Sequence, residues 1–545
     1  MKKLLLLLTL IFNSISWAQE YSPDFKVSRA DLTNMTYSKD TTASAVVIYD
    51  YGNVFFNKES FWLNVEIKQK IKILKNDGLR RATIQVPLYI GKNPIENIKD
   101  IRGTTYTLEN GEVKSTSLKD EGIFEEVDDN YKIVKFTLPN VQVGSIITFS
   151  YTKSTRYISK FQPWYFQGID PVIYSEYNTS IPGNYEYNIK LVGSIPLSDQ
   201  IAGVEYNCLE VGRGGSANCA LTTYKMRDIP AYRPEDYTTT ESNYISRIEY
   251  ELKIIRGFDG TVDKLTKNWS DVDDELKGDK DFGRVINRKA LVKNILPESI
   301  TSITEKIEKA KAIYNFVIDN YKWNNEYGRY DVDIKRLIDD KGGSAFELNL
   351  FLENLMYIED IEVYPILTST RDNGFITKVY PVLTDFNYIL IKAIIDEKEY
   401  FLDATDPYLT FGEIPYRTLN HYGRLFDFET ASYWEDIDAK NYGVQQFLTK
   451  LELNEDNKLS GVATHKLASY PSHRKKRHYD ENPELYLEKL KNEYDFIEIK
   501  SHKILNPDEN SGFFEEELEV VVDEEIVGDK IFFNPFLFRF FEENP

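Results

Sequence analysis

The chain has 545 residues, a length that exceeds one hydrophobic core and predicts three or four domains. Hydrophobic residues make up 42% of the sequence and aromatic residues 14%, which excludes an intrinsically disordered chain and favours β-rich domains. The net charge of −21 excludes nucleic acid as a partner, because its phosphates would be repelled.

The first 18 residues have the pattern of a secretory signal peptide. Two lysines precede an apolar run from Leu4 to Phe12, and a small-x-small segment ends at Ala18. Cleavage there would leave Gln19 as the first residue. A membrane anchor is the alternative, but the apolar run is too short to span a bilayer, and polar residues follow it. We expect export to the periplasm or the cell surface, with no transmembrane segment in the mature chain.

Residues 40–228 have the pattern of an antiparallel β-sandwich. Short alternating runs such as AVVIYD, VEIKQKIKIL and SIITFSYT are separated by turn sequences rich in Asn, Asp and Gly. Trp164, Tyr165 and Phe166 could line a binding face, although packing against a second sheet is the commoner use of such side chains. We therefore predict an N-terminal β-sandwich with an aromatic core.

Cys208 and Cys219 are the only cysteines of the chain, and they flank a glycine-rich turn. In an exported protein such a pair is more often a disulfide that closes a hairpin, and two unpaired thiols are the alternative. The pair has no histidine nearby, and the five histidines of the chain show no ligand-type spacing. Glycine motifs for phosphate or dinucleotide binding do not occur. We expect neither a metal nor a cofactor.

Residues 229–296 contain one strand pair and a charged stretch, and we interpret them as a linking segment. Residues 429–545 contain a hairpin, a helix and an edge-like strand, which predicts a C-terminal β-rich domain. The last apolar strand has no partner after it, so this domain is expected to be incomplete as given. The basic run HRKKRH at 473–478 could contact anionic lipid or glycan, but a solvated loop or helix face is the commoner role.

Residues 297–428 show helices followed by antiparallel strands, which predicts an α+β domain. A helix is expected from Ser302 to about Tyr321, with a capping box between Ser302 and Glu305. A second helix follows the glycines of KGGSAFELNLFLENL, residues 341–355. Apolar residues recur in it at helical spacing and predict one stripe against the core.

Several segments resemble known families. KGGSAFELNLFLENL, PILTSTRDNG and FLDATDP, in this order, resemble the transglutaminase-like superfamily. AVVIYDYGNVFF, KIKILKNDGL and WYFQGIDPVIYSEY resemble a domain of unknown function that accompanies it in secreted bacterial proteins. The resemblance covers about residues 43–428. It implies a papain-like α+β fold for the central domain.

Active members of that superfamily use a Cys at a helix N-terminus, a His on the next strand and an Asp on the strand after it. The resemblance places Ala345 at the cysteine, Tyr388 at the histidine and Asp403 at the aspartate, and a shift of one residue would place Ser344 at the cysteine. Only the aspartate is retained. No histidine precedes His421, so the Ser344 hydroxyl lacks a base. The resemblance therefore implies a domain without an intact catalytic site.

Two functions follow from these features. The first is a binding or scaffolding protein of the cell envelope, in which the β domains and the emptied cleft recognise a peptide, protein or glycan. The alternative is a transglutaminase-like or protease-like enzyme of amide chemistry with an unrecognised nucleophile. A structural module of a larger surface assembly is a third, weaker hypothesis. The sequence contains no feature that specifies an oligomeric state.

Overall fold

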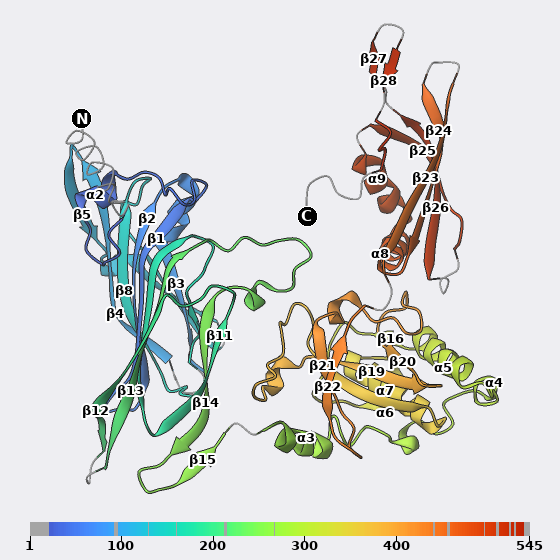
Figure 1. Ribbon diagram of the computed structural model, residues 1–545, viewed down its shortest axis with the longest axis horizontal. Helices are drawn as coiled ribbons and strands as arrows, with labels where there is room; N and C mark the ends of the chain where they lie inside the picture. Colours follow the sequence, from blue (N-terminus) through green and yellow to red (C-terminus); the bar gives the residue numbers. More distant parts are fainter. Residues whose placement is uncertain are drawn as a thin grey trace, which may run out of the picture. The chain divides into compact units, whose positions relative to one another are not determined.

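The computed structural model describes residues 21–91, 96–128, 130–159, 161–211, 215–265, 268–439, 442–454, 458–494, 496–507, 512–522, 525–527, 530–532 and 534–538. The signal peptide predicted at residues 1–18, with cleavage between Ala18 and Gln19, lies outside these ranges. The chain is multidomain and β-rich, with several separate sheets (Figure 1). It divides into unit 1, Met1–Glu235 with Glu241–Thr266, and unit 2, Asp236–Thr240 with Lys267–Pro545.

Unit 1 is built around an eight-stranded sheet in the order β12-β13-β10-β1-β2-β8-β4-β5. Its strands are β1 (Ala45–Phe56), β2 (Leu63–Ile73), β4 (Glu96–Glu109), β5 (Glu112–Ser117), β8 (Ile146–Thr155), β10 (Val172–Pro182), β12 (Asp199–Val211) and β13 (Gly215–Ile229). Strands β1 and β10 run parallel, with Val47 opposite Val172, whereas the other neighbours are antiparallel. The prediction of an antiparallel sandwich is wrong at this pair, because a long connection lets the chain return in the same direction.

Two smaller sheets share a core with the large one. They contain β11 (Tyr185–Val192), β14 (Arg247–Arg256), β15 (Val262–Lys264) and β9 (Trp164–Tyr165), and β3 (Thr83–Tyr89), β7 (Tyr131–Thr137) and β6 (Ile123–Asp128). Phe136 from β7 and Tyr250 from β14 belong to the same buried cluster as residues of β1 and β2. Trp164 and Phe166 are buried in this cluster, while Tyr165 is exposed. The packing role predicted for the aromatic residues is confirmed for these two. A short helix, α2 (Arg29–Thr33), precedes β1.

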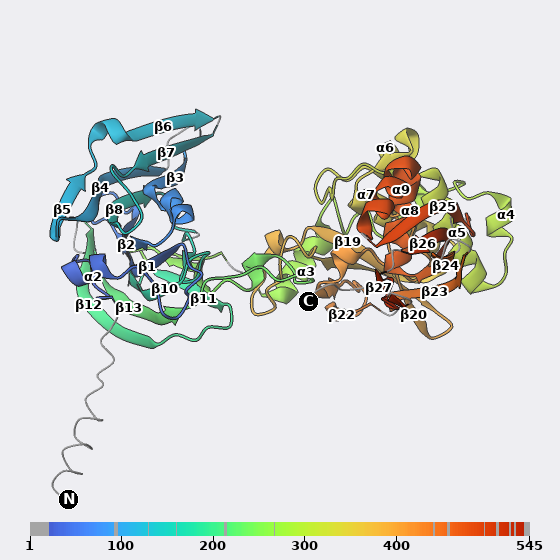
Figure 2. The same ribbon diagram turned by 90° about the horizontal axis from the view of Figure 1, so that it is seen from above.

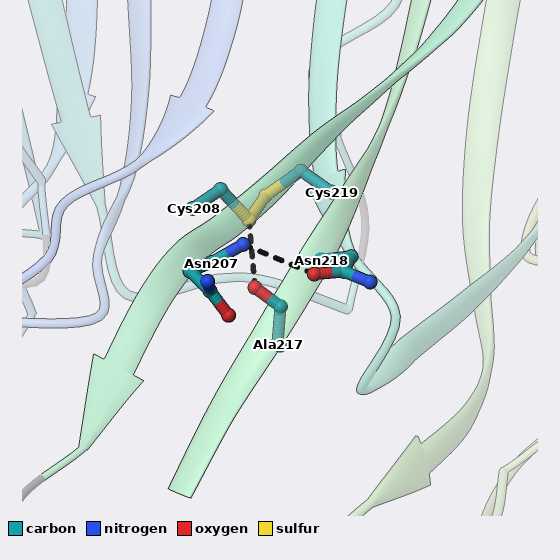
Figure 3. Close-up of a disulfide and its surroundings, with 5 residues drawn as sticks. All are labelled: Asn207, Cys208, Ala217, Asn218 and Cys219. Carbon is teal, nitrogen blue, oxygen red and sulfur yellow. Dashed lines mark hydrogen bonds between the residues drawn. A yellow bond between two sulfur atoms is a disulfide. The ribbon is translucent and has the colours of Figure 1, made fainter.

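The disulfide lies in the hairpin of β12 and β13. Cys208 and Cys219 are bonded, with 5.7 Å between their Cα atoms, and both side chains are buried. Beside the bond, the Asn207 backbone N–H donates to the Asn218 side chain at 3.0 Å (Figure 3). The predicted disulfide is confirmed, and the alternative of two unpaired thiols does not hold.

The segment 229–296, interpreted as linking, contributes layers to both units. Strand β14 pairs along β11 in unit 1, and Ile248 on it is buried. Helix α3 (Trp269–Gly278) lies in unit 2, where Val272 and Leu276 join the main core. Asp271, Asp274 and Glu275 are exposed, so the acidic composition of the stretch conceals an amphipathic helix.

The central part of unit 2 has helices packed against a five-stranded sheet in the order β20-β19-β18-β21-β22 (Figure 1). Its elements are α4 (Glu298–Thr301), α5 (Lys306–Asn320), β16 (Lys322–Trp323), α6 (Ile334–Asp340), β17 (Gly342–Gly343), α7 (Ala345–Ile358), β18 (Glu362–Thr368), β19 (Tyr388–Ile395), β20 (Lys398–Leu402), the 3-10 turn η6 (Tyr416–Thr418), β21 (His421–Leu425) and β22 (Tyr433–Ile437). Helix α7 contacts β18, β19, α5 and α6. The capping box predicted at Ser302 is wrong, because Ser302 closes α4 and Glu305 precedes α5.

The C-terminal part of unit 2 is a four-stranded sheet with two helices over it (Figures 1 and 2). Its elements are β23 (Val444–Leu453), β24 (Leu459–Ala468), α8 (Tyr470–Glu481), α9 (Pro483–Glu493), β25 (Ile497–Ile504) and β26 (Phe513–Val522), followed by β27 (Glu525–Val527) and β28 (Lys530–Phe532). The basic run 473–478 lies in α8, where His473 and Lys476 are buried. The predicted solvated helix face therefore holds for Arg474 and His478, which are exposed, but not for the two buried residues. Within the described ranges, no helix has the length and apolarity needed to cross a membrane.

Candidate functional site

The glycine turn before α7 positions the start of this helix. Strand β17, formed by Gly342 and Gly343, pairs with β16 and brings Trp323 beside the turn. Ser344 then caps α7, because its hydroxyl accepts the Glu347 N–H at 3.2 Å and the Glu347 carboxylate accepts the Ser344 N–H at 2.8 Å. This is a complete capping box. The N-terminus of α7 is therefore stabilised by hydrogen bonds between Ser344 and Glu347, two residues of the same segment.

The first N–H groups of α7 are all used within the chain. The Ala345 N–H donates to the Glu326 carbonyl at 2.9 Å, and the Phe346 N–H donates to the Tyr327 carbonyl at 3.1 Å. The next N–H is taken by the Ser344 hydroxyl. Because a helix attracts an anion through unpaired N–H groups at its start, this end offers no free donor for a thiolate or an oxyanion.

The Ser344 hydroxyl is buried and engaged in the helix cap. Its side chain is 4% exposed, and its recorded partner is the N–H of Glu347. Gly328, in a left-handed conformation at φ +68°, lies directly over it, so that a Cβ at this glycine would come within 2.4 Å of the Ser344 Oγ. The geometry assigns Ser344 to helix capping.

Helix α7 is buried on all sides over most of its length, not on the one stripe that its sequence predicts. Three polar side chains enter the core with it. Asn349 donates to the Asp403 carboxylate at 3.1 Å, and Asn354 donates to the Val285 carbonyl at 2.9 Å. The carboxylate of Glu353 accepts the Asn287 N–H at 3.3 Å, and burial raises the pKa of Glu353 to about 8. This helix is a central core element of unit 2.

Tyr388 and Asp403 are in contact with each other beside the first turns of α7. The Tyr388 hydroxyl donates to Asp403 Oδ2 at 2.8 Å, while the backbone N–H of Thr405 donates to Oδ1 at 2.8 Å and the Thr405 hydroxyl donates to the same oxygen. Ala345 lies in the same buried cluster as Tyr388. Ala345, Tyr388 and Asp403 are each 0% exposed. The structure thus brings the three positions together, but the cleft expected there is closed.

Arg417 covers this network, and sequence reasoning missed it. Its Nη2 donates to the Tyr388 hydroxyl at 3.0 Å and also to the Thr405 hydroxyl, and its guanidinium lies 4.3 Å from the centre of the Trp323 ring. The residue stands in η6, far along the chain from α7. No spacing or motif in PYRTLN distinguishes this arginine, so only the tertiary fold identifies it.

The electrostatics of the network keep the proton on the Tyr388 hydroxyl. Burial, together with the charge on Asp403, raises the pKa of Tyr388 well above its ordinary value, against an opposing effect of Arg417. Burial alone would lower the pKa of Arg417, but the neighbouring Tyr388 and Asp403 raise it. A phenol with a raised pKa stays protonated at neutral pH. The pair is therefore a fixed hydrogen bond and not a proton shuttle.

A pocket of about 420 Å³ opens beside the sealed network. It is lined by Trp323, Asn325, Thr405, Asp406 and Arg417 of the central part and by Arg477 of α8, among others. Arg477 forms an ion pair with Asp406. Ala345, Tyr388 and Asp403 do not line the pocket. Over the described residues, no cluster of His, Cys, Asp and Glu suited to a metal ion occurs.

Comparison with known proteins gives one matching family and several distant solved structures, two of which are described below. Residues 64–207, about a quarter of the chain, match DUF3857, a domain of unknown function with a solved structure. This confirms a domain of unknown function in the N-terminal part. No curated protein matches the chain.

Two of the similar structures are a "putative protease" from Parabacteroides distasonis and a "putative cysteine protease" from Cytophaga hutchinsonii. The first has 11% identity and a TM-score of 0.43, covering 91% of this chain and 95% of that chain. The second has 13% identity and a TM-score of 0.20, covering 49% of this chain and 91% of that chain. Both likenesses are too distant to indicate the chemistry of the site.

Proposed function

We propose that this protein is an exported cell-envelope protein whose transglutaminase-like domain is catalytically inactive and which binds an envelope peptide, protein or glycan. In this proposal Ala345, Tyr388 and Asp403 stand where the superfamily has its Cys, His and Asp. The observation that supports the proposal is the buried hydrogen bond from Tyr388 to Asp403, at the two positions where the resemblance puts the superfamily's His and Asp.

Amide chemistry at this site would need a nucleophile and a base, and neither is available. Ala345 has no nucleophilic atom, and the Ser344 hydroxyl is buried in its capping role. A general base must exchange a proton near neutral pH, which the raised pKa of Tyr388 prevents. Asp403 is saturated by hydrogen bonds from its neighbours. The arrangement of Ala345, Tyr388 and Asp403 is consistent with a folded core that has no nucleophile and no general base.

Binding is supported by the pocket next to this frame. Its volume of about 420 Å³ lies within the range of ligand-binding pockets, and its lining combines aromatic, amide and charged side chains that suit a peptide or a sugar. Export is supported by the disulfide between Cys208 and Cys219, since such bonds persist in oxidising compartments.

The proposal is tested by assays of the purified wild-type protein for peptide hydrolysis and for transfer of an amine to a glutamine peptide. Turnover at the level of a buffer blank is expected, and Ser344→Ala should leave it there. Wild-type turnover that Ser344→Ala abolishes would instead establish the alternative, an enzyme of amide chemistry. The binding arm is mass spectrometry of peptides and glycans captured from a defined envelope digest, with serum albumin as the control protein.

A further inference from the structure

Arg417 has hydrogen-bond donors to spare. Its Nη2 is used by Tyr388 and Thr405, but its Nη1 has no hydrogen-bond partner among the described residues. The Nε of Arg417 is buried and likewise has no hydrogen-bond partner among the described residues. Buried donors in folded proteins are nearly always paired. Arg417 is fixed in position and lines a pocket, so a ligand in that pocket could accept hydrogen bonds from its unused donors.

The positive charge of Arg417 also lacks a direct counter-ion. Across the described residues no carboxylate lies within ion-pair distance of Arg417. The Tyr388 hydroxyl stands between Arg417 and Asp403, because it bonds to both, and Asp406 forms its ion pair with Arg477. The pocket lining has three cationic residues, the third being Lys322, against Asp406 and Glu481. This locally positive pocket contrasts with the net charge of −21 of the chain.

Trp323 fixes the orientation of the guanidinium. The guanidinium carbon lies over the indole, 4.3 Å from the ring centre, and the Trp323 indole N–H donates to the Glu326 carbonyl at 2.8 Å, which holds the ring in place. A guanidinium stacked on an indole presents its N–H groups in one plane, the geometry that suits a carboxylate. Lysine cannot reproduce this planar arrangement.

We propose that the pocket binds a carboxylate of a peptide ligand, with Nη1 of Arg417 as the principal donor and Lys322 and Arg477 adding positive potential. This inference rests on the proposed binding function and specifies its ligand class. The carboxylate can belong to a peptide C-terminus or to an acidic side chain, and the two sources share the same chemistry.

The first experiment compares three acetylated tripeptides against the wild-type protein. They are trialanine with a free carboxylate, the same peptide with a C-terminal amide, and an amidated peptide with a central glutamate. Binding is followed by fluorine NMR of protein labelled with fluorinated tryptophan, with the Trp323 signal assigned by Trp323→Phe. The free acid is expected to bind about tenfold more tightly than its amide, since charge-assisted hydrogen bonds are the strong ones. The glutamate peptide distinguishes a side-chain carboxylate from a terminal one.

The second experiment uses Arg417→Lys, with Arg329→Lys as the matched control. Arg329 also lies over an aromatic ring, at 5.1 Å from the Tyr330 ring centre, but it does not line the pocket. Arg417→Lys should reduce the preference for acid over amide by about tenfold, and Arg329→Lys should leave it unchanged. Circular dichroism and thermal unfolding show whether each variant is folded, and the comparison of acid with amide in the wild type needs no variant.

Equal affinity for the acid and the amide, or no binding of any of the three peptides, would overturn the inference. So would an undiminished acid preference in folded Arg417→Lys. The failure of the proposed function looks different: it is turnover of peptides by the wild-type protein, which can occur with or without a carboxylate preference. A carboxylate preference without turnover supports both.

Discussion

Asp403 in the central part of unit 2 and Glu516 in its C-terminal sheet are both fully buried, and each accepts a hydrogen bond from a tyrosine. The Tyr388 hydroxyl lies 2.8 Å from Asp403, and the Tyr486 hydroxyl lies 2.7 Å from Glu516. The two carboxylates differ in their remaining partners. Asp403 has the Asn349 amide and both the backbone N–H and the hydroxyl of Thr405, whereas Glu516 has the imidazoles of His465, at 3.0 Å, and His502 and the ammonium of Lys475.

The contrast shows that the imidazoles absent from the predicted catalytic frame are present in a part of the molecule with no predicted catalytic role. His465 and His502 both contact Glu516, and His465 stacks on Phe447 at 3.8 Å between ring centres. A pair of histidine and carboxylate is therefore no sign of catalysis by itself. A nucleophile and an open pocket have to accompany it.

The two networks should also respond differently to pH. Burial alone would raise the pKa of Glu516, but hydrogen bonds from His465 and His502 and the charge of Lys475 outweigh it and hold the pKa well below its usual range. Burial lowers the pKa of His465, against the opposing hydrogen bond to Glu516. In the other network, the pKa of Tyr388 and the pKa of Arg417 are both raised, away from neutrality.

The largest effect is expected from removing the acceptor of the C-terminal network. Glu516→Ala should destabilise the protein by about 4 kcal/mol, because the histidines, Tyr486 and Lys475 would remain in the core without their acceptor. Urea unfolding measures the change. Glu519→Ala, on the exposed face of the same strand, is the control and should cost less than about 1 kcal/mol. Equal losses in the two variants would contradict the central role of Glu516.

A third buried carboxyl, Glu353 in α7, differs from both because its hydrogen-bond partner is the backbone N–H of Asn287. Its folded pKa of about 8 exceeds the ordinary value of about 4.5, so the unfolded chain loses the proton first and stability falls as the pH rises between these values. Glu353→Gln should remove this loss and stabilise the protein at pH 8 by on the order of 3 kcal/mol.

The measurement is urea unfolding of the wild type and Glu353→Gln at about pH 5 and about pH 8. Glu308→Gln, at an exposed ion pair on α5, is the matched control and should follow the wild type at both pH values. If wild type and Glu353→Gln show the same pH dependence, Glu353 is ionised in the fold and the assignment is wrong.

An intermediate effect is expected from Tyr388→Phe, which tests whether the central network is structural. Loss of the hydroxyl leaves one bond fewer to Asp403 and one acceptor fewer for Arg417, at a cost of about 2 kcal/mol. Thermal unfolding measures this cost. Tyr327→Phe is the control, since the Tyr327 ring packs edge-on against Tyr388, at 5.3 Å between ring centres, and stacks on Trp323 at 6.2 Å, and both contacts remain without the hydroxyl. A Tyr388→Phe protein as stable as the wild type would mean that the buried bond contributes nothing.

The smallest effect is the pH response of the C-terminal sheet. Because the folded pKa of His465 lies below the ordinary value of about 6.5, the unfolded chain takes up the proton first and stability is lost as the pH falls below that value. We expect a loss of about 1 kcal/mol between pH 7 and pH 5, read from hydrogen exchange of strand β26. His465→Asn keeps a donor but does not titrate, so the hydrogen-exchange protection of β26 in this variant should be the same at both pH values. Identical pH responses of this variant and the wild type would exclude His465 as the source.

Several features of the molecule are local and could be predicted from the sequence. The glycine turn, the Ser344 start and the apolar repeat predicted a helix that the structure has at Ala345–Ile358. The two cysteines around one turn predicted the disulfide. These predictions work because caps, turns and periodicity depend on neighbours a few residues apart. The helix predicted from Ser302 began four residues too early, as helix ends depend on competing caps.

The tertiary structure alone decided what surrounds these elements. It paired β1 with β10 in parallel, placed β14 beside β11, and buried α7 on every side so that Glu353 lies in the core. It also places Arg417 over the Trp323 ring and buries Ala345, Tyr388 and Asp403, where the sequence led us to expect an open cleft. Each of these contacts joins residues far apart in the chain. No local pattern encodes them, because they are set by how whole elements pack against one another.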